Sequence, residues 1–508
     1  METMTSWAFR ALEISAALFV FLLGSLVLVV LVLYIRDITQ TQQAIRRNYP
    51  VLGRFRYWFE HMGEFFRQYF FAQDREEMPF NRAQRSWVYR AAKDLDATIA
   101  FGSTRPLNQP GDIIFLNCLL PTLKEDAVPP EPIHFGQGVC RQPYTTTSFF
   151  NISGMSFGAL SVPAVRALSL GAARAGIWIN TGEGGLSPYH LEGGGDIVFQ
   201  IGTAKYGVRD DAGCLSDERL KAIAAHPEVR MFELKLSQGA KPGKGGILPG
   251  EKVTAEIAAI RGIPEGQDSI SPNGHPEIRS VSDLLDMLNH IRTVTGKPVG
   301  FKAVLGGTDW LEKLGQLIQQ RGPVSAPDFI TLDSADGGTG AAPQSLMDYM
   351  GLPIKLSLPL LIRWRERYGL SERIRVIASG KLINPSDVAW ALCVGADAIV
   401  SARGFMFALG CIQALQCNKN RCPTGITTHD PKLQKGLVVE DKSHRVAHYA
   451  TNLMHEVGVI AHSCGVKGPH QLRPIHAMVI DDHGMPSPLP GTEQSEPDSA
   501  GKPPKLNQ

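Results

Sequence analysis

Short apolar runs alternate with helical patterns through the central part of the chain. Continuous apolar runs are typical of buried parallel strands. We predict strands at 149–153, 177–181, 231–237, 299–305, 328–334, 354–362, 374–380 and 398–404. Helical spacing separates them, for instance at 280–296, with Ser280 or Ser282 as the N-cap, and at 384–396.

Eight strand-plus-helix units predict an α/β fold, a (β/α)₈ TIM barrel. A doubly wound open sheet is the alternative architecture. It needs fewer strands and a Gly-x-Gly-x-x-Gly turn, which the segment SGMSFGAL does not supply.

A long apolar segment lies near the N-terminus. Residues 16–35 carry no charge and have about the 20 residues that cross a bilayer. A cleaved signal peptide would have a shorter apolar core. Five arginines follow (Arg36, Arg46, Arg47, Arg54 and Arg56), against Arg10 before it. We therefore expect a single-pass anchor, residues 1–36, in the inner (cytoplasmic) membrane, with the catalytic domain facing the cytoplasm.

The remaining boundaries follow from composition. Residues 37–148 form a helical lead-in, 149–480 the barrel, and 481–508 a tail rich in Pro, Ser and Gly that we expect to be disordered. Within the lead-in, residues 50–72 mix aromatic residues with arginines. They fit either an amphipathic helix at the membrane surface or a helix packed on the barrel.

Overall composition restricts the function only broadly. A net charge of +2 gives no basic footprint, so we expect no nucleic-acid partner. Eight dispersed cysteines do not form a secreted disulfide framework. The visible excess is in glycine, with 51 residues.

Glycines and polar residues gather where the predicted strands end. In a barrel enzyme these loops build the active site, and a phosphate commonly lies after strands seven and eight. Gly380 with Lys381, and Arg403 with Gly404, offer backbone N–H groups plus a cation. The other strand-end clusters include Gln238, Asp336, Gly337 and Gly338. They indicate a phosphate-bearing cofactor with a flat polar ring across the barrel mouth.

Three cysteines, Cys411, Cys417 and Cys422, lie within twelve residues after the last predicted strand. Structural zinc needs four ligands; His429 could be the fourth, but a Cys-x-x-Cys knuckle is missing. Buried inert thiols are another interpretation. An iron–sulfur cluster held by three thiolates fits best, because a cuboidal cluster lacking one iron needs three protein ligands.

Several motifs together resemble one family. TGEGG, QGAKPGKGGILPGEKV, ISPNGHPEIRSVSDL, DGGTGAAP and ALGCIQALQCNKNRCPTGITTHDP resemble the FMN-binding synthase domain of glutamate synthases. The N-terminal portion resembles that of stand-alone bacterial relatives with a leading membrane helix. The resemblance implies FMN, and a [3Fe–4S] cluster on Cys411, Cys417 and Cys422.

The resemblance also implies roles for individual residues. Gly154, Met155 and Ser156 would line the flavin and substrate pocket, and Lys235 and Lys302 would approach the flavin ring, where a cation stabilises its reduced form. Lys241 and Arg261 would hold substrate carboxylates. Glu183 would position or protonate an imino nitrogen.

Four positions depart from the family pattern. Leu186 replaces an acidic residue, Ile247 a glutamine, Ser379-Gly380-Lys381 an Asp-Gly-Gly, and Asn418 a histidine. The chain begins Met-Glu and its first cysteine is Cys118, so we expect no N-terminal cysteine nucleophile that takes nitrogen from glutamine.

Three functions remain as hypotheses. The first is an oxidoreductase acting on a 2-oxo acid, an imine or an amino acid, with electrons from a separate ferredoxin-like or other donor. The second is an N-methylglutamate-synthase-like transferase subunit. The third is a membrane-tethered electron-transfer partner without turnover, for which Lys241 and Arg261 would have no use.

Overall fold

The computed structural model describes residues 2–96 and 98–489, and the chain divides into two units, 1–83 and 84–508. The first unit holds α1 (Glu2–Thr39), α2 (Ala44–Asn48), α3 (Gly53–Phe66) and a π-helical turn, η1 (Arg67–Phe71). Within α1, Phe9–Thr39 is apolar and long enough to cross a membrane, although a signal sequence near an N-terminus has the same properties. The predicted N-terminal apolar helix is therefore present.

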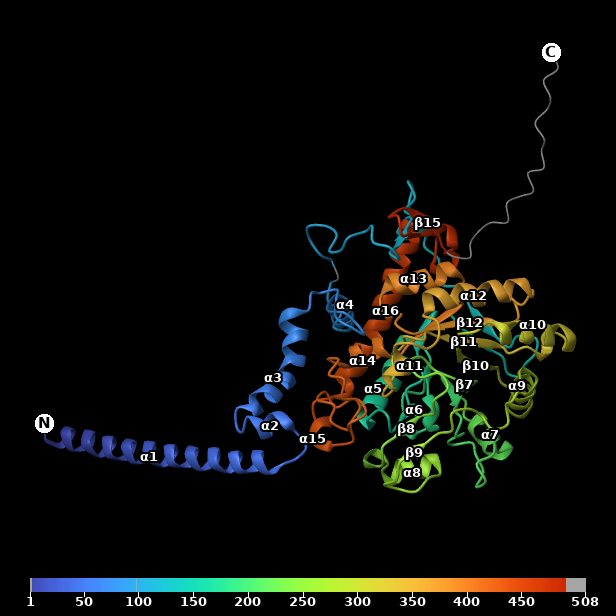
Figure 1. Cartoon of the computed structure of the whole chain (residues 1–508). Coiled ribbons are helices and arrows are strands. Elements are labelled where there is room, and N and C mark those ends of the chain that lie inside the picture. The colour runs from blue at the N-terminus through green and yellow to red at the C-terminus, as the bar shows by residue number, and fades with distance from the viewer. Residues whose placement is uncertain (1, 97, 490–508) are drawn as a thin grey trace, which may run out of the picture. The chain divides into compact units, whose positions relative to one another are not determined.

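The second unit is built on a closed barrel of parallel strands (Figure 1). Its strands are β4 (Phe150–Ile152), β5 (Ile179–Asn180), β6 (Ile197–Ile201), β7 (Val229–Lys235), β10 (Val299–Val304), β11 (Phe329–Asp333), β12 (Arg375–Ser379) and β13 (Ala398–Ser401). The last strand, β13, pairs with the first, β4, so that the ring is complete. This confirms the TIM-barrel prediction.

Helices surround the ring. The longer ones are α4 (Arg82–Ala92), α5 (Val162–Ala175), α9 (Val281–Thr295), α10 (Asp309–Arg321), α12 (Ile354–Arg367), α13 (Pro385–Val394) and α16 (Val439–Ser463). Shorter ones are α6 (Pro188–Leu191), α7 (Asp217–Ala224), α8 (Ala255–Arg261), α11 (Gln344–Met347), α14 (Arg403–Leu409) and α15 (Pro431–Gln434). Ser280, not Ser282, caps α9, because its hydroxyl accepts the N–H of Asp283.

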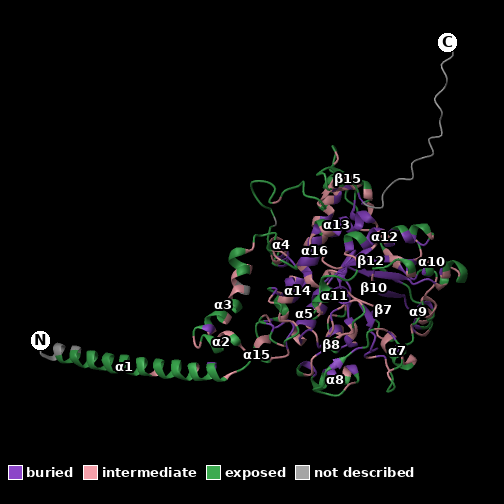
Figure 2. Ribbon diagram, viewed as in Figure 1, coloured by how far each residue is buried: buried purple, intermediate pink, exposed green. Residues whose placement is uncertain are grey.

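One end of the barrel is filled. The lead-in hairpin β2 (Ile133–Phe135) and β3 (Tyr144–Thr146) brings Phe135 and Tyr144 into a buried cluster with Trp178 and Phe329. These last two residues lie at or just before the N-terminal ends of their strands. Figure 2 shows the barrel strands buried. The opposite, C-terminal end is left for a site.

One predicted strand is wrong and one strand is missed. Residues 354–362 begin the helix α12, in which Ile354, Leu358, Leu361 and Ile362 are buried at helical spacing. The missing barrel strand is β6, whose five residues are all buried. A short apolar run does not by itself distinguish a strand from a buried helix.

Small antiparallel sheets complete the second unit. β1 (Ile113–Phe115) pairs with β14 (Ala477–Ile480), which pairs with β15 (Pro486–Pro488). β15 lies within the predicted tail, 481–508, of which 490–508 are outside the described residues. β8 (Ile247–Leu248) pairs with β9 (Ser269–Ile270).

Candidate active site

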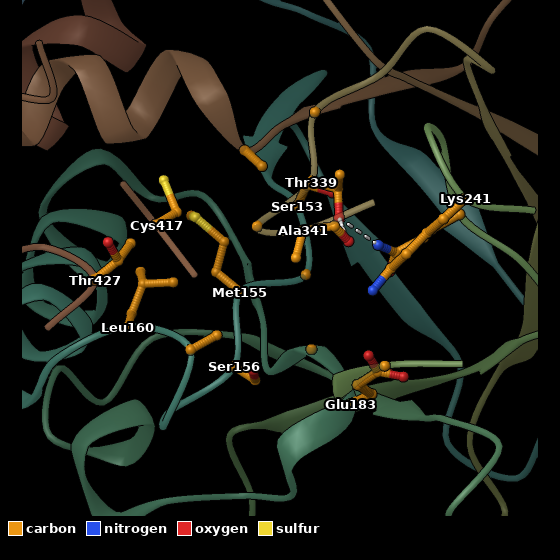
Figure 3. A pocket seen from close by; sticks show the side chains of 18 of the residues that line it. Ser153, Met155, Ser156, Leu160, Glu183, Lys241, Thr339, Ala341, Cys417 and Thr427 are labelled. Atoms are coloured by element: carbon orange, nitrogen blue, oxygen red, sulfur yellow. Dashed lines mark hydrogen bonds between the residues drawn. The ribbon is translucent and has the colours of Figure 1, made fainter. Parts of the chain in front are cut away.

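A pocket opens at the C-terminal ends of the barrel strands (Figure 3). The predicted residues that line it are Gly154, Met155, Ser156, Glu183, Lys235, Gln238, Lys241, Arg261, Lys302, Gly338, Gly380, Lys381, Arg403 and Cys417. The predicted residues outside its lining are Asp336, Gly337, Gly404, Cys411 and Cys422. In Figure 3, Glu183 and Lys241 lie on one side of the pocket, and Met155 and Cys417 lie on the other.

Glu183 is held in the short helical turn after β5. Its Oε2 lies 3.1 Å from Nζ of Lys235. Burial opposes its charge, but Lys235, Lys241 and Arg261 together keep the pKa of Glu183 below its ordinary value. A Cβ at Gly202 or Gly246 would come within 2.6 Å of the Glu183 side chain. Glycines at these two positions therefore leave the space that the Glu183 side chain occupies.

Lys241 is a buried cation without an ion-pair partner among the residues that the structure describes. Burial lowers its pKa, and the charge of Lys235 lowers it further. Lys302, in contrast, pairs with Asp333, with 3.3 Å between Nζ and Oδ2. Lys241 is therefore available to an anionic group entering the pocket.

Arg261 is fixed at the end of α8. Its guanidinium donates to Oγ of Ser269 (3.1 Å) and to the carbonyl oxygen of Phe157 (3.2 Å). It also stacks 5.1 Å from the ring centre of Tyr206. The buried Nε has no partner within the described part of the chain. Arg261 thus lines the pocket with a guanidinium whose orientation is fixed by the protein and whose hydrogen-bonding capacity is only partly used within the described residues.

The residues predicted to bind the phosphate differ in their surroundings. Lys381 has φ +58° and pairs with Asp336, with 2.9 Å between Nζ and Oδ2. Arg403 donates to the carbonyl oxygen of Thr339 and lies 3.9 Å from Sγ of Cys417. The N–H of Gly404 donates to Ser401. Two cations therefore reach the pocket here, whereas Gly404 packs inside the protein.

The three cysteines lie in the loop after α14. Burial is the main cause that raises the pKa of Cys411 to about 11. Burial would raise the pKa of Cys422 as well, but hydrogen bonds from Thr424 and Thr427 lower it overall. Within the described ranges, no three His, Cys, Asp or Glu side chains are placed to hold a metal ion. Nε2 of His429 bonds to the carbonyl oxygen of Gly158.

The same loop has an unusual backbone. Gln413, Leu415 and Asn420 adopt the left-handed region, with φ of +57°, +55° and +52°. For residues other than glycine this conformation costs about 1 kcal/mol or more each, and it persists where the surroundings determine it. The loop is therefore held in a specific shape.

Lys252 helps to hold that shape, and the sequence analysis missed it. Its ammonium group is buried and donates to the carbonyl oxygens of Cys417 (2.9 Å) and Thr427 (2.6 Å). Burial lowers the pKa of Lys252. A fully buried lysine requires compensation, and the carbonyl oxygens of Cys417 and Thr427 supply part of it here.

A second missed group lies under the pocket. Nε2 of Gln200, on β6, donates to the buried carboxylate of Glu233 (2.5 Å), which also accepts from Asn180 and Thr331. Gln200 lines the pocket. It was missed because β6 itself was missed.

All of the departing residues except Leu186 line the pocket: Ile247, Ser379, Gly380, Lys381 and Asn418. Ile247 is 49% exposed. This part of the wall therefore presents an apolar side chain where the family pattern has an amide.

Comparison with known proteins places these motifs in a family. Residues 121–467 match the model of the conserved region in glutamate synthase. The chain is 38% identical to the glutamate synthase large subunit-like protein YerD of Bacillus subtilis, over 92% of this chain and 96% of that one. It is 35% identical to the archaeal glutamate synthase [NADPH] of Methanocaldococcus jannaschii, over 63% of this chain and 60% of that one.

Solved structures resemble the chain only distantly. A mutant of a chimeric (S)-mandelate dehydrogenase shares 14% identity with a TM-score of 0.47, over 78% of this chain and 99% of that one. At this distance the similarity does not bear on function.

Proposed function

The chain belongs to the glutamate synthase family, and on that premise we propose that it is an FMN and iron–sulfur oxidoreductase anchored in the cytoplasmic membrane. It would form glutamate, or a related amino acid, reductively from a 2-oxo acid or its imine. Electrons would come from a separate donor.

The observation that carries this proposal is that one wall of the pocket holds buried cations and a carboxylate, and another wall holds a cysteine. Lys241 and Arg261 are buried cations that suit a substrate with two carboxylates. Glu183, paired with Lys235, would orient the substrate nitrogen and exchange a proton with it. Cys417 forms part of the other wall. Substrate chemistry and a thiol site thus share one pocket.

The residues present fit FMN. When bound, FMN supplies hydride transfer and accepts electrons singly. Lys235 and Lys302, on adjacent strands β7 and β10, would lie beside its ring, as would Met155. Lys381 and Arg403 would bind its phosphate. The guanidinium of Arg261 and the ammonium of Lys241, which has no ion-pair partner among the described residues, would remain for the substrate.

The donor set also fits an iron–sulfur cluster. Three cysteines gather in one shaped loop, with Arg403 and the buried Lys252 as positive charges around them. Thiolates that bind different irons of a cluster stand farther apart than ligands of a single ion. Cys411, Cys417 and Cys422 would therefore hold the [3Fe–4S] cluster.

The proposed location depends on α1. Its apolar span is followed by arginines, which favours the cytoplasmic side for the barrel.

The test is reconstitution of the full chain with chemically reduced donor, ammonia and a panel of 2-oxo acids. We expect an amino-acid product, identified by mass spectrometry, that Lys241→Met and Arg261→Met each reduce at least 100-fold. Lys244→Met, at an exposed lysine of the same loop, is the control. Flavin that no 2-oxo acid can reoxidise would contradict the proposal.

A further inference from the structure

The first unit carries an apolar surface besides α1. The apolar residues of α3 recur at helical spacing, at Phe55, Trp58, Phe59, Met62 and Phe66. Phe55, Trp58 and Phe59 are 54%, 53% and 61% exposed. Phe70 and Phe71, in η1, are 68% and 75% exposed. An aromatic surface of this extent indicates a partner.

The end of α1 is fastened to the start of α3. Asp37 is 1% exposed, and its carboxylate accepts Nε and Nη2 of Arg54 (2.8 and 2.7 Å) and the N–H of Val51 (2.9 Å). A bidentate pair in which the carboxylate is buried fixes geometry as well as charge. The direction of α3 relative to α1 is therefore set by the protein.

The intervening helix α2 adds to this joint. A Cβ at Gly53 would lie 2.7 Å from the carbonyl oxygen of Ile45, so α3 starts in close contact with α2. The guanidinium of Arg46 stacks 4.7 Å from the ring centre of Tyr57. In Figure 1, α3 runs across the direction of α1.

The charge of this region is positive. Outside the Asp37–Arg54 pair, residues 36–72 carry five arginines against two glutamates: Arg36, Arg46, Arg47, Arg56 and Arg67, against Glu60 and Glu64. Arginines beside exposed aromatic side chains suit an interface in which anionic headgroups border acyl chains.

We propose that α3 and η1 lie in the surface of the anionic bilayer that α1 crosses. A helix that runs across a spanning helix follows the membrane plane, so its aromatic face can enter the interface while the arginines meet lipid headgroups. The Asp37–Arg54 pair would hold α3 at that level. This inference rests on the membrane anchoring proposed above and adds a second, lateral contact.

The test uses the full chain reconstituted in phosphatidylcholine vesicles with and without phosphatidylglycerol, containing lipids brominated near the headgroup end of the acyl chain. The fluorescence of Trp58 is the difference between the protein and its Trp58→Phe variant. We expect brominated lipid to quench this component more than twofold, and more strongly in anionic vesicles.

Arg54→Gln and Arg56→Gln form a matched pair, because each removes one arginine from α3 but only Arg54 bonds to Asp37. We expect Arg54→Gln to lose at least half of the Trp58 quenching and Arg56→Gln to keep most of it. Equal quenching in the two variants would overturn the positioning role of the pair.

Two failures can be told apart by flotation of the same samples. Protein that does not float with vesicles contradicts the anchoring by α1. Protein that floats but whose Trp58 is not quenched by brominated lipid overturns the surface contact alone.

Discussion

Lys252 is a buried lysine with no carboxylate within ion-pair distance in the described part of the chain. Its two hydrogen bonds end on the backbone of Cys417 and Thr427. This role could not be predicted from the sequence, because a lysine after Gly-Glu is usually a solvated surface cation. Contacts between residues 165 or more positions apart appear only in the folded chain.

Lys252→Met should loosen the cysteine loop. It removes both donors and leaves two carbonyl groups unsatisfied, at a cost of about 1–3 kcal/mol each. We expect faster amide hydrogen exchange in residues 411–428 and a loss of iron. Lys244→Met, an exposed lysine, is the control; unchanged exchange in Lys252→Met would show that the loop is held by other contacts.

If the proposed cluster is bound, single Cys→Ser changes at Cys411, Cys417 or Cys422 should each deplete iron severely, since the sequence from 394 to 463 contains no other cysteine. Iron analysis and electron paramagnetic resonance of the oxidised protein measure this, because an oxidised three-iron cluster is paramagnetic. Cys214→Ser, at an exposed cysteine, should keep the signal. Stoichiometric zinc without iron in the unmodified protein would refute the cluster.

His190 should make stability depend on pH. Burial lowers its pKa to about 4, from 6.5. As the pH falls below 6.5, the unfolded chain takes up a proton that the folded protein excludes, so stability present above pH 6.5 is lost towards pH 4. Between pH 7 and pH 5 the loss is about 2 kcal/mol. Urea unfolding at both pH values should show a smaller loss in His190→Asn; an equal loss would contradict this assignment.

At the scale of elements, most strands could be predicted because their apolar runs are fully buried. The two exceptions have different causes. Residues 354–362 are as apolar as a strand, yet Pro359 lies among them, and proline is disfavoured in a central strand. β6 was missed although it is as long as β11 and β12; its apolar run is interrupted by the polar Gln200. Gln200 is nonetheless buried, because Glu233 on the next strand accepts its hydrogen bond.

The loops after β12 and β13 should bind the FMN phosphate together. The double change Lys381→Ala and Arg403→Ala removes both cations that reach this end of the pocket, so we expect loss of most bound FMN, measured by absorbance after gel filtration. Lys419→Ala with Arg421→Ala, at exposed cations of the next loop, is the matched control. Full FMN content in the first pair would place the phosphate elsewhere.

For the whole molecule, composition predicts the order of anchor, lead-in, barrel and tail. It does not predict which side chains, distant in sequence, come together in the pocket. Glu183 and Lys235 are far apart in sequence. They meet because Glu183 follows β5 and Lys235 ends β7, and only β6 separates these two strands in the ring. The family motifs supplied their candidate roles; periodicity alone did not.

Removal of residues 1–36 should change how the protein leaves a membrane. The barrel closes within residues 150–401, so we expect the shortened chain to fold and bind FMN. It would retain the positively charged aromatic surface of α3, and high salt rather than detergent should then release it. Sedimentation of membranes washed with 1 M salt measures this; a shortened chain that still requires detergent would show that α1 is not the main anchor.

The pairing of β4 with β13 has a consequence for synthesis. The ring cannot close until residue 401 has left the ribosome, because that residue ends the strand that pairs with β4. Until then the nascent chain presents two open strand edges, which readily pair with other chains. We therefore expect the growing polypeptide to depend on chaperones. The first barrel strands should need this protection longest, because they leave the ribosome first and the ring closes only when β13 has been made.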